Sequence, residues 1–284
     1  MSLYEKYQHK KSAEFTRLVG VSYGTFQILL QKVTQQIRHY KQQKPMRQRG
    51  RKGSLAVADQ LLLTMLYLRQ YHTFLQLGEL FDISESYAQK RYTFMVKMRL
   101  QALDLPNEKA LTEEHLTLLM DVTEQEIERP VKKQRSFFSG KKKRHTIKIL
   151  LLVCWLTGVI QAVRAARGPK HDYKIFVESG LELSATTCFK VDKGFQGIQL
   201  QYPKAQVPDK ATKLHPLTKE QKQANRQLAR ERILVEHLNR ECKIFRICQA
   251  RYRGKHKNYE KTWKLVAALV NLKRATRHLQ FASP

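Results

Sequence analysis

The chain has 284 residues, of which 42% are hydrophobic and 27% are charged. This composition can bury a substantial core and excludes an intrinsically disordered chain. Lysine and arginine outnumber aspartate and glutamate by 53 to 24, so the formal net charge is +29. A surplus of that size indicates a polyanionic partner, and nucleic acid is the commonest one. A ribosome-like or membrane-surface protein is the alternative.

The longest apolar run, residues 149–160, is too short to span a bilayer. No signal peptide opens the chain, so we expect no membrane partner and a cytoplasmic location. The cysteines form no CxxC pair, and we expect buried thiols in a reducing compartment at Cys154, Cys188, Cys242 and Cys248. A zinc site could use His237, Cys242 and Cys248, but their spacing matches no common zinc pattern.

The positive charge is concentrated in three segments that contain no acidic residue: 38–52, 132–144 and 251–257. A charge run is most often a solvated face. Three such runs in one strongly basic chain favour contact with a phosphate backbone. The side chains that we expect to contact DNA in the first two runs are Arg47, Arg49, Arg51, Lys141, Lys142, Lys143 and Arg144.

Residues 1–108 are predicted to form a helical region. Apolar residues recur at helical spacing over 12–37, with a break at 20–22 that indicates two short helices. The Pro/Arg/Gly-containing stretch after Lys44 is predicted to be a linker. A strongly apolar helix should follow it, with Ser54 as its N-cap.

Residues 73–98 are predicted to form a helix-turn-helix. A helix from Phe74 to Phe81 should meet the turn Asp82-Ile83-Ser84, and Ser84 should cap the second helix. Small residues at Gly78 and Ala88 would let the two helices cross closely. Many helical proteins make this crossing without DNA, and an aspartate replaces the glycine often found at the turn. The element would direct four side chains at a major groove: Glu85, Ser86, Gln89 and Lys90.

Residues 109–284 are predicted to form a second, α/β domain. Strands are expected within 116–130, over 144–156 and over 159–168, with a tight turn at Thr157-Gly158. A short helix from His171, a strand over 186–191 and a long helix over 218–247 should follow. This order indicates a mixed sheet flanked by helices, in which ligands gather at strand ends.

Three acidic residues stand out in this basic chain. Asp121 lies in or beside the first strand, and Asp192 follows the last strand and precedes Gly194. Glu236 shares one helix face with Arg232, Arg240 and Lys243. The alternatives are a turn aspartate for Asp192 and a solvated face with weak ion pairs for the helix. Asp172, at the start of a helix, is explained by capping.

Two strand-end aspartates and a helix glutamate can also converge on a pair of divalent cations. Such cations stabilise the attacking and leaving oxygens of an in-line phosphoryl transfer. Hard cations such as Mg²⁺ require oxygen ligands, and carboxylates supply them. The sequence therefore predicts a metal site in which the acids hold cations while the surrounding lysines and arginines hold DNA.

Three segments also carry a resemblance to a known family. "MDVTEQEIERP" resembles the text around its first catalytic aspartate, and "VDKGFQG" fits Asp-x-Gly-Tyr/Phe around its second. "RILVEHLNRECK" fits Arg-x₃-Glu-x₆-Lys, with Arg232, Glu236 and Lys243 in place. Ala229 stands where related families have a tyrosine before the arginine. Together with the N-terminal helix-turn-helix, the chain resembles the DDE-type insertion-sequence transposases of the IS-five-like family, which are related to the Harbinger transposases.

The resemblance implies an RNase H-like catalytic domain that uses two divalent cations, Mg²⁺ or alternatively Mn²⁺, held by Asp121, Asp192 and Glu236. It implies cleavage at the ends of an insertion sequence and joining of the freed 3′-hydroxyls to target DNA. Arg232 and Lys243 would contact the backbone near the scissile bond, with Arg240 beside them. Double-stranded DNA and further copies of the chain are the implied partners, at the bacterial nucleoid, with no small-molecule substrate. An inactive transposase-derived DNA-binding protein and a cellular nuclease of the same fold are the alternatives.

Overall fold

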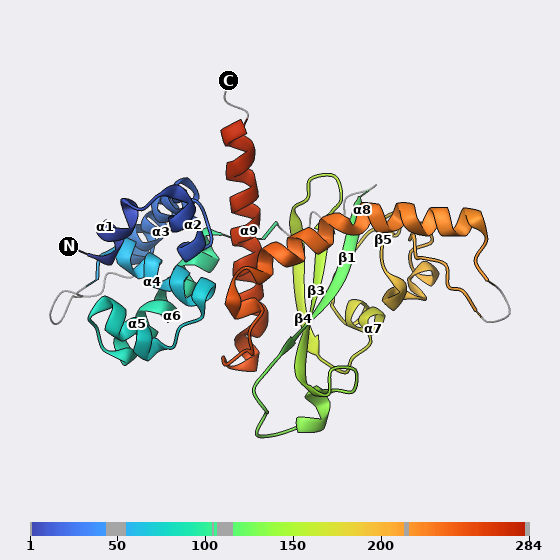
Figure 1. The fold of residues 1–284 in the computed structure, drawn as a ribbon, viewed down its shortest axis with the longest axis horizontal. Coiled ribbons are helices and arrows are strands. Elements are labelled where there is room, and N and C mark those ends of the chain that lie inside the picture. Colours follow the sequence, from blue (N-terminus) through green and yellow to red (C-terminus); the bar gives the residue numbers. More distant parts are fainter. Residues whose placement is uncertain (1, 44–54, 104, 107–115, 213–215, 282–284) are drawn as a thin grey trace. The chain divides into compact units, whose positions relative to one another are not determined.

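The computed structural model describes residues 2–43, 55–103, 105–106, 116–212 and 216–281 (Figure 1). They form two compact units. The first contains Met1–Asp104, Lys243–Gln249 and Ala268–Pro284, and the second contains Leu105–Cys242 and Ala250–Ala267. The predicted domain boundary between residues 108 and 109 lies outside the described residues and stays a prediction.

The first unit is helical, as predicted. The described residues of its N-terminal part form these helices in chain order: α1 Leu3–Gln8, α2 Ser12–Val19, α3 Tyr23–Gln43, α4 Val57–Gln70, α5 Phe74–Phe81 and α6 Glu85–Ala102. The predicted break at 20–22 is confirmed, because Gly20 ends α2 in the left-handed conformation with φ +91°. The second of the two predicted short helices is long, since α3 has 21 residues. The predicted cap Ser54 lies outside the described residues, and Ala56 caps α4 without a side-chain hydrogen bond.

Two later segments complete the first unit. The segment around η5 (Arg246–Cys248) packs on the early helices: a Cβ added to Gly20 would lie 2.8 Å from a ring carbon of Phe245. The Arg69 guanidinium also donates to the backbone oxygen of Ile244. The C-terminal part of α9 (Tyr259–Phe281) contributes Thr276, whose hydroxyl lies 2.8 Å from that of buried Thr25. The core of this unit therefore uses residues from both ends of the chain.

The second unit is built on a mixed sheet, as predicted, and this sheet has five strands where the sequence indicated four. Strands β1 (Thr117–Glu126), β3 (Arg144–Cys154) and β4 (Ile160–Arg167) are antiparallel neighbours, and β5 (Cys188–Lys190) runs parallel to β1. The short strand β2 (Phe138–Ser139), which the sequence did not indicate, pairs with the start of β3. The strand predicted over 186–191 is only three residues long.

Helices cover both faces of this sheet (Figure 1). Alternate residues of β1, including Leu118 and Met120, join an apolar core with Phe176 of α7 (Asp172–Val177). The opposite face meets α8 (Lys219–Lys243) and α9. There the Gln125 side-chain oxygen accepts hydrogen bonds from the Tyr259 hydroxyl, 2.8 Å, and the Trp263 indole, 3.2 Å. The long helix predicted over 218–247 ends earlier than predicted, because α8 stops at Lys243 and the separate short helix η5 follows it.

Candidate active site and DNA-binding element

Asp121 lies in the middle of β1, on the sheet face that α8 covers. Its side chain is 18% exposed. The amide nitrogen of Asn239 on α8 donates to its Oδ2 at 2.9 Å, and Nη2 of Arg232 lies 4.0 Å from its Oδ1. Two side chains of one helix, α8, therefore approach this carboxylate.

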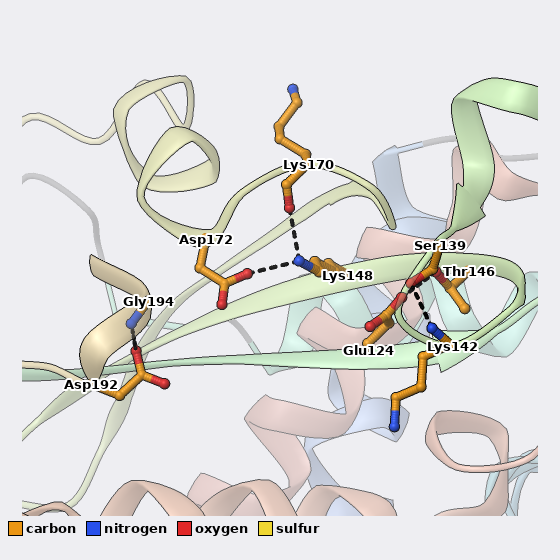
Figure 2. Close-up of polar contacts among 9 residues, drawn as sticks. All are labelled: Glu124, Ser139, Lys142, Thr146, Lys148, Lys170, Asp172, Asp192 and Gly194. Carbon is orange, nitrogen blue, oxygen red and sulfur yellow. Dashed lines mark hydrogen bonds and ion pairs between the residues drawn. The ribbon is translucent and has the colours of Figure 1, made fainter. Parts of the chain in front are cut away.

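Asp192 follows β5, the parallel neighbour of β1, and is close enough to Asp121 for their charges to interact. The parallel register pairs Leu119 with Lys190, so continuing it by two residues brings Asp121 and Asp192 to the same level. Oδ1 of Asp192 accepts a hydrogen bond from the Gly194 backbone at 2.9 Å and caps the short helix η3, Lys193–Phe195 (Figure 2). Its Oδ2 has no hydrogen-bond partner among the described residues, so one oxygen is available to a ligand.

The two aspartates influence each other electrostatically. Burial raises the pKa of Asp121 above its ordinary value, and the charge of Asp192 raises it further. The hydrogen bond from Asn239 and the charge of Arg232 act in the opposite direction. The structure therefore brings together two of the three predicted acids, in an environment that favours binding of a positive charge.

Glu236 is exposed on the same helix as the two residues that contact Asp121. It lies four residues after Arg232 and three residues before Asn239, so all three share one face of α8. In the part of the chain that the structure describes, no three His, Cys, Asp or Glu side chains form a group that could hold a metal ion. The zinc site considered for His237, Cys242 and Cys248 is therefore not formed by these described residues. All four cysteines are free thiols.

Asp172 has a larger role than the helix cap predicted for it. His171 is the N-cap residue of α7, and Asp172 occupies the first turn. Its Oδ1 pairs with Lys148 of β3 at 2.9 Å, and the same ammonium donates to the backbone oxygen of Lys170 (Figure 2). The capping explanation was incomplete because it considered α7 without the adjacent strand.

The carboxylates of Asp172 and Asp192 both lie close to Gly194. A Cβ added there would lie 2.9 Å from Oδ2 of Asp172 and 3.0 Å from Oδ1 of Asp192. This close approach accounts for the glycine in "VDKGFQG". It also places a third carboxylate beside the turn that carries Asp192.

The predicted helix-turn-helix is present in the first unit. Asp82 ends α5 in the left-handed region, φ 51° and ψ 54°, which aspartate tolerates better than most residues. The Ser84 hydroxyl accepts from the Tyr87 backbone at 3.3 Å and thus caps α6, as predicted. A Cβ added to Gly78 would lie 2.7 Å from the Ile83 backbone oxygen, so the helices cross too closely for a side chain. The exposed residues at the start of α6 include all four predicted groove contacts: Glu85, Ser86, Gln89 and Lys90.

The other predicted DNA contacts have varied surroundings. Lys141, Lys142 and Lys143 are exposed in the turn between β2 and β3, whereas Arg144 pairs with Glu126 at 2.8 Å. Arg240 is exposed on α8, and Lys243 is the last residue of that helix. Arg47, Arg49 and Arg51 lie outside the described residues. None of the described helices is long and apolar enough to cross a membrane.

The structure combines a helix-turn-helix element with a mixed sheet that carries two neighbouring aspartates, and comparison with known families assigns this combination to DNA endonucleases. Residues 120–271 match the DDE superfamily endonucleases, and residues 53–103 match the helix-turn-helix of the same superfamily. The chain belongs to the DDE superfamily endonucleases, and the predicted resemblance is confirmed.

Over 280 residues the chain is 36% identical to the "Probable transposase for insertion sequence element IS702" of Microchaete diplosiphon. The aligned part covers 96% of this chain and 99% of that protein. No solved structure matches the chain.

The raised pKa of Asp121 predicts how stability depends on pH in the absence of metal. The stabilising effect of its protonated form is complete below the ordinary aspartate pKa and is lost as the pH rises through the raised folded-state pKa. With a chelator at neutral pH, Asp121→Asn should therefore have a higher Tm than the parent protein. The difference should shrink at acidic pH. Thermal unfolding measured at several pH values checks this.

The matched control for that measurement is Asp209→Asn, which removes an exposed carboxylate from a loop. It changes the net charge equally. If the Tm of Asp121→Asn at neutral pH were no higher than the Tm of Asp209→Asn, the electrostatic account of Asp121 would be contradicted.

Proposed function

We propose that this chain is a transposase that cuts the ends of its own insertion sequence and joins the freed 3′-hydroxyls to target DNA. The observation that carries the proposal is the proximity of Asp121, on β1, and Asp192, two residues after the neighbouring strand β5. Helix α8, which carries Glu236, contacts Asp121 through Arg232 and Asn239. The similarity to the IS702 transposase over nearly the whole chain supports it.

The proposed ligands supply the donor type that a pair of divalent cations requires. Oδ2 of Asp192 and the Glu236 carboxylate have no hydrogen-bond or ion-pair partner among the described residues, and carboxylate oxygens are the ligands that Mg²⁺ and Mn²⁺ prefer. Asp121, Asp192 and Glu236 would hold the cations. When bound, two such cations offset the negative charge that develops on the attacking and leaving oxygens.

The remaining side chains would hold and orient DNA. Arg232 lies 4.0 Å from Asp121 and would contact the DNA backbone near the scissile bond. Arg240 and Lys243 extend the same basic helix, and Lys141, Lys142, Lys143 and Arg144 offer a second contact. Ser86, Gln89 and Lys90 would read the element ends in a major groove. Arg47, Arg49 and Arg51 would add backbone contacts. Two ends must meet, so we propose self-association in a synaptic complex at the nucleoid.

Strand cleavage of DNA that carries the element's own flanks tests the proposal. Purified protein with Mg²⁺ should cut at the element end, leave a 3′-hydroxyl and join it to a second duplex, and a chelator should stop both reactions. Binding of the ends without any cleavage would favour the second candidate, an inactive transposase-derived DNA-binding protein.

Asn239 is expected to act as a positioning residue for the proposed reaction. Asn239→Ala removes the hydrogen bond to Asp121, and loss of such a supporting contact typically lowers metal affinity or activity by about 10–100-fold. Mn²⁺ binding followed by calorimetry, together with cleavage, would measure the effect.

Asn225→Ala on the same helix is the matched control, since among the described residues the Asn225 side chain bonds to the backbone of Asp209 and not to Asp121. Equal metal affinity in the two variants would show that Asn239 does not position Asp121.

A further inference from the structure

The N-terminal half of α8 carries a row of four cations that the sequence analysis did not single out. Lys219, Lys222, Arg226 and Arg230 are spaced by three or four residues, so they lie on one face of the helix. We call them the α8 basic row. With Gln223 and Gln227 they line a surface hollow of about 670 Å³.

The packing of α8 turns this row towards solvent. Asn225 exchanges two hydrogen bonds with the Asp209 backbone, at 2.9 and 3.1 Å. Leu228 is buried, and Glu231 pairs with Lys190 at 2.6 Å. By helical periodicity these three residues lie on the side of α8 opposite the row. All four cations are therefore exposed.

The charge of the row is not compensated. Elsewhere in the second unit Lys148, Lys190 and Arg251 each pair with a carboxylate. None of the row's four cations has an ion-pair partner within the residues that the structure describes. Between residues 219 and 230 the only acid in the sequence is Glu220, which helical periodicity directs about 100° away from Lys219. Such a concentration of free positive charge attracts a polyanion.

We propose that the α8 basic row binds the phosphate backbone of duplex DNA beside the cleaved position. The same helix places Arg232 at Asp121 and carries Glu236, so DNA on the row would lead directly to the acids. At a rise of about 1.5 Å per residue, the row extends from about 9 to about 26 Å from Glu236. On duplex DNA these distances correspond to about 3–8 base pairs. The inference rests on the proposed function.

The salt dependence of DNA binding tests the proposal. Each phosphate contact contributes about 0.9 to the slope of log Kobs against log salt concentration. Arg226→Gln with Arg230→Gln should lower the magnitude of that slope by about 1.8, and so should Lys219→Gln with Lys222→Gln. Glutamine keeps a high helix propensity, and all four sites are exposed, so folding should be retained. Circular dichroism checks this.

Two control variants make the result specific. Lys10→Gln with Lys11→Gln removes the same charge from exposed residues of the first unit and should leave the slope within about 0.5 of the parent value. Lys219→Arg with Lys222→Arg keeps the charge and should keep the slope. In a hydroxyl-radical footprint on end DNA, only the glutamine variants of the row should lose protection about 3–8 base pairs from the cut.

The outcomes separate this inference from the proposed function. The salt slope can be measured on any duplex and needs no cleavage, so a parent protein that fails to cut leaves this measurement valid. If the glutamine variants of the α8 basic row had the same slopes and footprints as the Lys10/Lys11 control, the inference would be overturned. Cleavage of element-end DNA by the parent protein would still support the proposed function. Loss of self-association with unchanged DNA affinity would also overturn it and would assign the row to contact between copies.

Discussion

Asp192→Asn should lower the rate of metal-dependent DNA cleavage by about 10³-fold or more, because a cation at a phosphoryl-transfer site contributes several kcal/mol. Asparagine keeps an oxygen that can accept the Gly194 hydrogen bond, so the turn should persist while the charge is lost. Single-turnover cleavage of element-end DNA at saturating Mg²⁺ measures the effect. Asp121→Asn and Glu236→Gln should behave similarly.

The control for these variants is again Asp209→Asn, whose loop carboxylate lies outside the proposed site. It should cut at the parent rate. DNA binding should be equal in all of these proteins, since none of the substitutions touches the helix-turn-helix. Cleavage at the parent rate by Asp192→Asn or Glu236→Gln would refute the assignment of that residue as a ligand.

Gly78→Val should destabilise the helix-turn-helix by about 3 kcal/mol, the upper part of the range for overpacked sites. The added Cβ would lie 2.7 Å from the Ile83 backbone oxygen and 3.3 Å from the Glu85 backbone nitrogen. Both contacts are backbone atoms, so relief requires the turn itself to move. We expect a lower Tm and loss of specific binding to element ends, measured by unfolding and by titration with end DNA and unrelated DNA.

Glu79→Val separates the close crossing from the helix propensity of valine. Glu79 is the next residue of α5 and is exposed, so the same side chain meets no neighbour there. Its cost should be about 0.5 kcal/mol, from propensity alone. If Gly78→Val were as stable as Glu79→Val, the two helices could move apart without loss of folding stability.

The sequence predicted the elements whose signals are local. The break at Gly20, the turn at Asp82 to Ser84 and the cap at Ser84 follow from residue chemistry within a few positions, and the structure confirms them. The alternation in β1 likewise predicted a strand, and the apolar run of β3 predicted a buried one. Strand β2 has two residues and therefore no period to detect.

The contacts that support the site depend on tertiary packing and could not be predicted from spacing. Asn239 is one of several polar residues on α8, and only its burial against β1 shows that it binds Asp121. The pairing of Asp172 with Lys148 likewise joins a helix start to a strand. Glu236 shares the predicted helix face, but periodicity does not determine the rotamer of an exposed side chain. The convergence of all three acids therefore stays a prediction.

The first unit takes part of its core from the end of the chain, where Phe245 packs against Gly20 and Thr276 meets Thr25. A fragment that stops near residue 104 keeps the helix-turn-helix but exposes the apolar surface that Phe245 covers. Such a product of a premature stop codon would be prone to aggregation and proteolysis. Truncated copies of the gene should therefore yield little stable DNA-binding fragment to compete with the intact protein. Expression of residues 1–104 by themselves should give insoluble or rapidly degraded material.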